Sequence, residues 1–215
     1  MKLTDFLESS HPLISPLLDW DDTQLVAAFQ QRPQEGKFFV AIFCKYAALT
    51  YSLLVNKAPT QIQVEYMFAK VWRNLFLELR SLSLEQLDDD ASNSPTASNN
   101  QVLQGWIFNR TALSIHTEQV PSIEAIPYSM DVAPLPFWCY VQTALDSISP
   151  LSRLTLVLTQ TFRWPQAKIL SFLAAEGTSL TRAELAELLT EAQTELNDAM
   201  PTDIQDIYGV KESAA

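Results

Sequence analysis

Hydrophobic side chains recur along the first third of the chain at helical spacing. Leu25, Val26 and Phe29 fall on one face directly after Asp21-Asp22-Thr23, a run that suits a helix N-cap. The segment 37–55 is apolar on nearly every side, which is typical of the central helix of a bundle. The pattern therefore predicts one helix that begins near residue 21 and a second, buried helix over 37–55.

A third helix is predicted over 61–80, after a break that contains Pro59. The polar run 85–100 is poor in apolar residues and is expected to be a mobile loop, followed by a helix over 101–117. The apolar stripe of the third helix consists of Val64, Phe68, Val71, Trp72, Leu75 and Leu79.

Four prolines in the segment 120–137 predict a linker, and further helical segments follow it. Gly177 marks the turn between the last two of them, and Thr181-Arg182-Ala183-Glu184 matches a capping box. The predicted helices lie over 138–147, 150–161, 165–175 and 181–199, and the last should bury Leu185, Leu188, Leu189, Ala192 and Leu196.

These segments predict an all-α protein with two helical domains, over 21–119 and 138–208. Residues 1–20, interrupted by Pro12 and Pro16, are expected to be an N-terminal arm, and 209–215 a tail. Only four Gly against twelve Pro in 215 residues fits helices with proline-marked ends better than a turn-rich β fold.

Composition argues against several classes of protein. The chain has no run of eighteen apolar residues and no signal-like start, so we expect a cytoplasmic protein without a membrane span. Cys44 and Cys139 are isolated on apolar segments, which predicts buried thiols. His11 and His116 do not form a metal motif, and a Gly-rich phosphate loop is missing. We therefore expect neither an enzyme nor a cofactor.

Two segments in fixed order carry the main functional signal. Residues 61–73 read QIQVEYMFAKVWR, with Phe68 and Trp72 in an F-x-x-x-W pattern, and residues 105–112 read GWIFNRTA. The pair resembles the promoter-recognition helices of bacterial RNA polymerase sigma factors of the extracytoplasmic-function type. In that family, a helix of pattern E-D-L-x-Q-x-x-F-x-x-x-W binds the β′ subunit of core RNA polymerase. The resemblance implies that Gln61, Glu65 and Arg73 contact the polymerase.

The resemblance also implies two DNA contacts. The helix 101–117 corresponds to the one that recognises the −10 promoter element, and 165–199 has the spacing of a helix-turn-helix that reads the −35 element. A phosphate-binding surface requires Lys or Arg, and polar side chains can add contacts. The implied DNA-binding residues are Trp106, Asn109, Arg110, Arg163, Lys168, Thr178, Ser179 and Arg182.

The charge of the chain leaves three interpretations of its function open. The net charge is −11, Arg110 is the only base over 81–138, and the last predicted helix carries Glu184, Glu187 and Glu191 toward solvent. One interpretation is a sigma-factor-like protein that directs promoter recognition. A second is a sigma-fold adaptor or antagonist that binds polymerase, or a regulator such as an anti-sigma protein, without reading DNA. A third is a helical scaffold unrelated to transcription.

Overall fold

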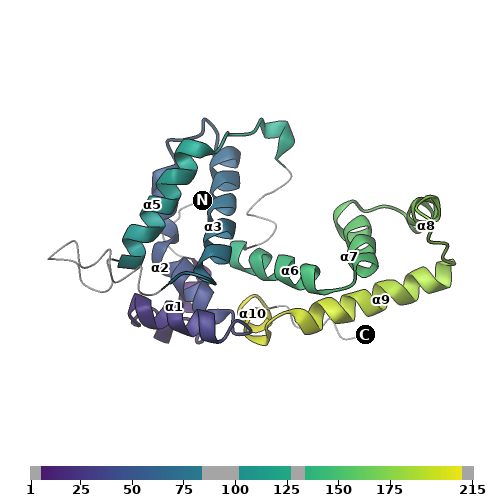
Figure 1. The fold of residues 1–215 in the computed structure, drawn as a ribbon, viewed down its shortest axis with the longest axis horizontal. Coiled ribbons are helices and arrows are strands. Elements are labelled where there is room, and N and C mark those ends of the chain that lie inside the picture. The colour runs from purple at the N-terminus through teal and green to yellow at the C-terminus, as the bar shows by residue number, and fades with distance from the viewer. Residues whose placement is uncertain (1–5, 84–101, 127–133, 210–215) are drawn as a thin grey trace. The chain divides into compact units, whose positions relative to one another are not determined.

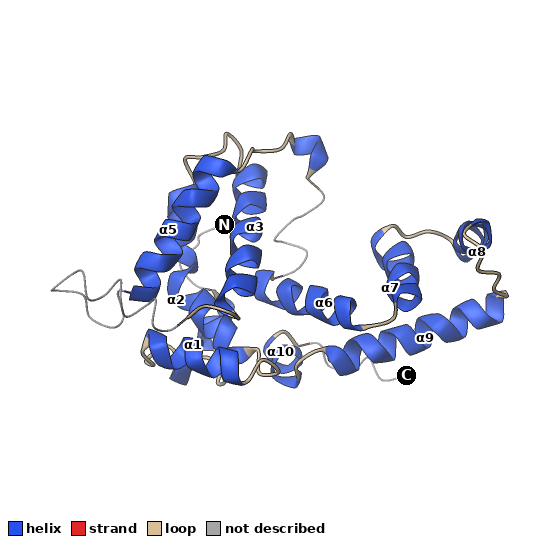
Figure 2. Cartoon of the chain, in the orientation of Figure 1, coloured by secondary structure: helices blue, strands red, loops and turns tan. Residues whose placement is uncertain are grey.

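The computed structural model describes residues 6–83, 102–126 and 134–209, and over these ranges every regular element is a helix (Figure 2). This confirms the predicted all-α class. The described chain separates into two compact units. The first extends to Cys139 and resumes at Thr202, and the second is Tyr140–Pro201.

The first unit is a bundle around α2 (Figure 1). Its helices are α1 (Asp22–Gln31), α2 (Lys37–Leu54), α3 (Gln61–Leu79), α5 (Val102–Thr117) and α10 (Thr202–Ile207). α2 packs against α1, α3, α5 and α10, which agrees with its predicted central place. By length and composition α2 could also cross a membrane, a property it shares with the buried core helices of soluble proteins, and 56% of it is buried.

Aromatic rings from α1, α2 and α3 fill the centre of this bundle. Phe39 lies 4.7 Å from Phe76 and Phe43 lies 4.8 Å from Trp72, both in edge-to-face geometry between ring centroids. Trp72 is fully buried and donates its indole N–H to Thr50 Oγ1 at 2.8 Å. All six residues predicted for the apolar stripe of 61–80 are buried.

The N-terminal arm contributes to the same core through two short 3₁₀ helices, Leu7–Ser10 and Ser15–Leu17. Ile14 is fully buried between them, although Pro12 and Pro16 prevent a regular helix there. A third 3₁₀ helix, Ile123–Ala125, follows α5. The predicted loop 85–100 lies outside the described residues.

A carboxylate near the end of the chain caps the N-terminus of α2. Asp203 in α10 accepts hydrogen bonds from the backbone N–H groups of Gly36 and Lys37, at 3.0 and 2.9 Å. Helix N-termini leave such donors without intrahelical partners, and Gly36 has no side chain with which to cap them. α10 therefore belongs to the first unit, whereas the sequence placed residues up to 208 in a C-terminal domain.

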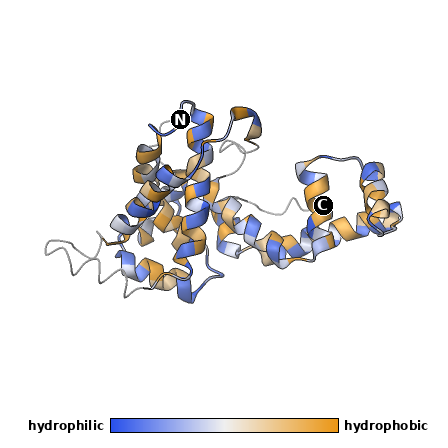
Figure 3. Cartoon of the chain, turned by 45° about the horizontal axis from the view of Figure 1, so that its top comes forward, coloured by the Kyte–Doolittle hydropathy of each residue, from blue (hydrophilic) through white to orange (hydrophobic). Residues whose placement is uncertain are grey.

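The second unit contains most of α6 (Leu135–Ser147), α7 (Pro150–Leu156), a π-helical turn (Val157–Thr161), α8 (Gln166–Ala175) and α9 (Arg182–Ala199). Its main cluster of buried residues is Leu158, Ile169, Leu173 and Leu185. The helices of both units carry mixed hydrophobic and hydrophilic faces (Figure 3).

Three details differ from the sequence prediction in this part of the chain. α6 begins at Leu135, within the predicted linker, and the division between the units falls inside α6 rather than in the proline-rich segment. The predicted helix 150–161 changes to π-helical bonding at Val157. On α9, Leu185 and Ala192 are buried, while the other three predicted core positions are partly exposed.

Candidate functional surfaces

The start of α3 carries two of the three residues that were predicted to bind polymerase. Thr60 caps the helix by accepting from the backbone N–H of Gln63. The Gln61 side-chain amide donates to the Glu65 carboxylate at 2.7 Å, one turn further along. Gln61 is exposed and Glu65 is half-buried. The two therefore form one polar pair at the first turn of α3.

Arg73, the third predicted residue, lies on a separate line of side chains that we call the outer stripe of α3. Its members recur at intervals of three and four residues, so they share one side of the helix. Ile62 and Leu77 are 47% and 52% exposed, and Arg73 is exposed between them. The outer stripe consists of Ile62, Tyr66, Ala69, Arg73, Leu77 and Arg80.

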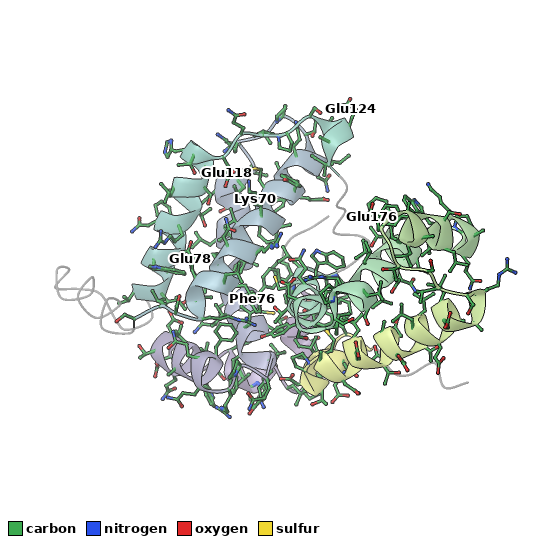
Figure 4. All side chains as sticks on the ribbon, turned by 45° about the vertical axis from the view of Figure 1, so that its right-hand side comes forward. Lys70, Phe76, Glu78, Glu118, Glu124 and Glu176 are labelled. Carbon is green, nitrogen blue, oxygen red and sulfur yellow. The ribbon has the colours of Figure 1, made fainter. Side chains whose placement is uncertain are left out.

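Two ion pairs fix α5 alongside α3. Figure 4 labels Lys70, Glu78 and Glu118, which are three of the four residues in these pairs. Lys70 pairs with Glu118, and Glu78 pairs with Arg110 at 2.9 Å between Oε2 and Nε. The pairing of 70 with 118 and of 78 with 110 shows that the two helices run antiparallel. Both pairs are partly exposed, so each is expected to stabilise the packing only modestly.

The predicted −10 surface on α5 carries little positive charge, because Arg110 is the one Lys or Arg on that helix. Arg110 is held by Glu78 and also lies 5.7 Å from the centre of the Trp106 ring. Trp106 is half-buried, whereas Asn109 is exposed. The same helix exposes Phe108, 44% accessible, beside Asn109. A surface of this kind offers apolar and amide contacts rather than phosphate neutralisation.

The turn between α8 and α9 has well-formed helix ends. Gly177 adopts φ 87°, which glycine tolerates best, and the backbone N–H of Thr178 donates to the Leu173 carbonyl at 2.8 Å. Thr181 and Glu184 form the predicted capping box at the start of α9. Hydrogen bonds from the Thr181 backbone and hydroxyl lower the pKa of the Glu184 carboxyl. α8 and α9 are therefore joined by a short, well-defined turn, in which Thr178 is half-buried and Ser179 is exposed.

The solvent face of α9 is acidic where a DNA-reading helix presents cations. Arg182, at the first position of α9, is exposed. Beyond Arg182, the exposed charged side chains on this helix are Glu184, Glu187, Glu191, Glu195 and Asp198. Like charge disfavours placing this face against phosphates.

The remaining predicted cations gather just before and within α8. Arg163 is exposed and has φ 50°, a left-handed conformation that non-glycine residues rarely adopt. The Lys168 ammonium lies 3.7 Å from the centre of the Trp164 ring, within cation–π distance. The structure therefore brings Lys168 against the ring of Trp164, a contact that the sequence alone did not indicate.

A buried polar cluster in the first unit was also missed by sequence reasoning. Asp22 is only 1% exposed, accepts from the Lys45 ammonium at 2.9 Å and accepts from the Tyr46 hydroxyl. Burial raises the pKa of Tyr46, and the hydrogen bond to Asp22 raises it further. Asp22 was expected to serve as ordinary N-cap chemistry, and its burial depends on α2 packing across it. The cluster ties the start of α1 to α2.

Of the two thiols predicted to be buried, Cys139 is buried and Cys44 is only partly buried. Burial raises the pKa of Cys44 to about 12 and that of Cys139 to about 12. Thiolates are the reactive form, so these raised pKa values disfavour reaction of either thiol at neutral pH. Among the residues that the structure describes, no group of three His, Cys, Asp or Glu side chains is arranged to hold a metal ion.

Comparison of the chain with protein-family models, with curated proteins and with solved structures finds no match.

Proposed function

We propose that the chain is a sigma-factor-like transcription initiation protein that binds core RNA polymerase through α3. The observation that carries the proposal is the two-sided character of this helix. Phe68 and Trp72, which match the family pattern, face the core, while Arg73 lies on the outer stripe with Ile62 and Leu77 exposed.

An outer stripe of this composition suits a protein partner. Apolar side chains at i, i+4 and i+7 spacing are the usual anchors when a helix binds a groove or another helix. Arginine and tyrosine are enriched where protein surfaces meet. The β′ subunit of core polymerase is the partner that the family resemblance implies. The proposed setting is the bacterial cytoplasm, with promoter DNA contacted by α5 and by the α8–α9 pair.

Arg73→Glu is expected to weaken binding to core polymerase by at least about tenfold, because it reverses the charge at the centre of the outer stripe. Glu65→Lys should have a comparable effect at the start of the helix. Binding would be measured by co-purification and by titration with labelled protein, and far-UV circular dichroism should be unchanged. Arg153→Glu, in the second unit, is the matched control and should bind normally. Equal affinities for Arg73→Glu and the unaltered protein would remove α3 from the proposal.

A second candidate function is favoured by the acidic face of α9 and by the Arg110–Glu78 pair. These features suit an adaptor or antagonist that binds polymerase or a regulator without sequence-specific DNA contact. Transcription from genomic fragments with core polymerase distinguishes the two. Promoter-specific transcripts support the initiation protein, and binding without transcripts supports the adaptor.

The charge of α9 can be tested directly. Glu184→Arg with Glu187→Arg replaces two repulsive contacts near the start of α9 by attractive ones, so duplex DNA affinity should rise about tenfold or more at low salt. Because Glu184 is half of the capping box, Glu187→Arg with Glu191→Arg is the matched pair that spares the cap. Affinity would be measured by fluorescence anisotropy over a salt series. Unchanged affinity in both pairs would favour a face that meets protein.

A further inference from the structure

Unusual features of the second unit converge on one short stretch, residues 157–168. It begins with the π-helical turn Val157–Thr161 and continues into Arg163, whose φ is 50°. π-helical turns and left-handed non-glycine residues both cost stability, and both occur preferentially at functional sites. The stretch also holds Phe162, which at 60% exposure is the most accessible aromatic side chain among the described large hydrophobic residues.

Backbone hydrogen bonds fix the conformation of residues 157–164. The Phe162 N–H closes the π turn on the Val157 carbonyl at 3.1 Å, and the Trp164 N–H returns to the Leu158 carbonyl at 3.0 Å. Leu158 belongs to the buried cluster of the unit, and Trp164 packs against that cluster. Phe162 is therefore displayed from a fixed backbone rather than from a loose loop, which lowers the entropy lost on binding.

Three aromatic rings extend from the interior to the surface in this part of the unit. Phe172 and Trp164 meet edge to face with centroids 5.7 Å apart, and Trp164 and Phe162 lie 6.3 Å apart. Lys168 covers the face of Trp164 at 3.7 Å, and the exposed Arg163 stands between the two outer rings in sequence. This stretch therefore combines an accessible apolar side chain, Phe162, with two cations, in a unit whose longest helix, α9, is acidic.

We propose that Phe162, Arg163, Trp164 and Lys168 form a binding site for an acidic segment of a partner protein that inserts an apolar side chain against Phe162. We call these four residues the 162–168 corner. Exposed aromatic and arginine side chains are the residue types that dominate binding energy at protein interfaces. The two cations complement carboxylates that flank the inserted side chain. This inference is independent of the polymerase contact proposed for α3, and it assigns Arg163 and Lys168 to a protein partner in place of the promoter contact proposed for the α8–α9 pair.

A nucleic-acid strand fits the corner less well than a protein segment. Base-stacking sites use successive aromatic faces within a positively charged groove. Here Lys168 already occupies a face of Trp164, so Phe162 alone is left for stacking. Two cations neutralise only a few phosphates of a nucleic-acid strand, each nucleotide of which adds a further charge. The balance of apolar surface and limited charge favours an acidic peptide.

The test is selection of a phage-displayed random dodecapeptide library on the full-length protein. The proposal expects enrichment of peptides in which Leu, Phe or Trp is flanked by Asp or Glu. The enriched peptide should bind at least about tenfold more weakly to Phe162→Ala, the usual effect of losing an aromatic anchor. Arg163→Gly should also weaken it while relieving the left-handed backbone. Leu154→Ala is the matched control, since Leu154 is a partly exposed apolar residue elsewhere in the unit.

Three results would overturn the proposal. They are the absence of acidic–apolar enrichment, enriched peptides that bind Phe162→Ala as well as the unaltered protein, and tighter binding of a single-stranded oligothymidine than of the enriched peptide, with the same dependence on Phe162. The last outcome would assign the corner to nucleic acid. Polymerase co-purification measured on the same variants should not change, which keeps this inference separate from the proposal for α3.

Discussion

Trp72→Ala is expected to lower the free energy of unfolding of the first unit by about 4 kcal/mol, the usual cost of truncating a fully buried Trp. Trp72 packs against Phe39, Phe43 and Phe68, with ring centroids 6.0, 4.8 and 6.4 Å away. The substitution also leaves the Thr50 hydroxyl without its indole donor. Urea denaturation followed by circular dichroism measures the loss.

Trp138→Ala is the control for this change, because Trp138 is a tryptophan of the same unit with 36% of its surface exposed. It should cost about 1 kcal/mol or less. Equal losses for the two variants would contradict the central place of Trp72 in the core. Since a large loss unfolds the domain, Trp72 is unsuitable for testing polymerase contacts, and substitutions on the outer stripe serve that purpose.

The second large effect is expected at Asp22. Asp22→Ala should destabilise the first unit by about 3–5 kcal/mol, because it leaves the Lys45 ammonium, only 16% exposed, without its carboxylate partner. The Tyr46 hydroxyl loses its acceptor in the same step. Thermal and urea unfolding of Asp22→Ala, Lys45→Met and the double variant measure the coupling between the two charges.

The double variant should be more stable than the sum of the single losses predicts, since it buries no unpaired charge. Glu78→Ala supplies the comparison for a surface pair, because Glu78 and Arg110 are 41% and 45% exposed. That variant should lose about 0.5 kcal/mol. Additive losses at Asp22 and Lys45 would mean that the cluster contributes no coupling energy.

The helices could be predicted from sequence because their signals are local. The apolar stripe from Val64 to Leu79 and the capping box at Thr181 each lie within a few turns of chain, and both are formed as expected. The face that α3 turns to solvent also followed from periodicity, once the buried stripe was assigned.

Features that depend on distant contacts could not be predicted in this way. Asp22 looks like an ordinary capping residue until α2 covers it, and Asp203 looks like a first-turn acid of α10 until it meets Gly36. The accessible Phe162 follows from the π turn and from the left-handed Arg163, neither of which has a reliable local sequence signature. Of the candidate surfaces, the outer stripe of α3 was therefore partly predictable, and the 162–168 corner was not.

The cap that Asp203 places on α2 has a consequence for the order of folding during synthesis. A ribosome releases the residues of α1, α2, α3 and α5 first, yet the carboxylate that binds the Gly36 and Lys37 amides emerges more than one hundred and sixty residues later. The second unit, Tyr140–Pro201, leaves the ribosome before that carboxylate does. The first unit is therefore synthesised first, but its fold is completed only after Asp203 has emerged. Nascent chains stalled before residue 203 should expose the start of α2 to proteolysis.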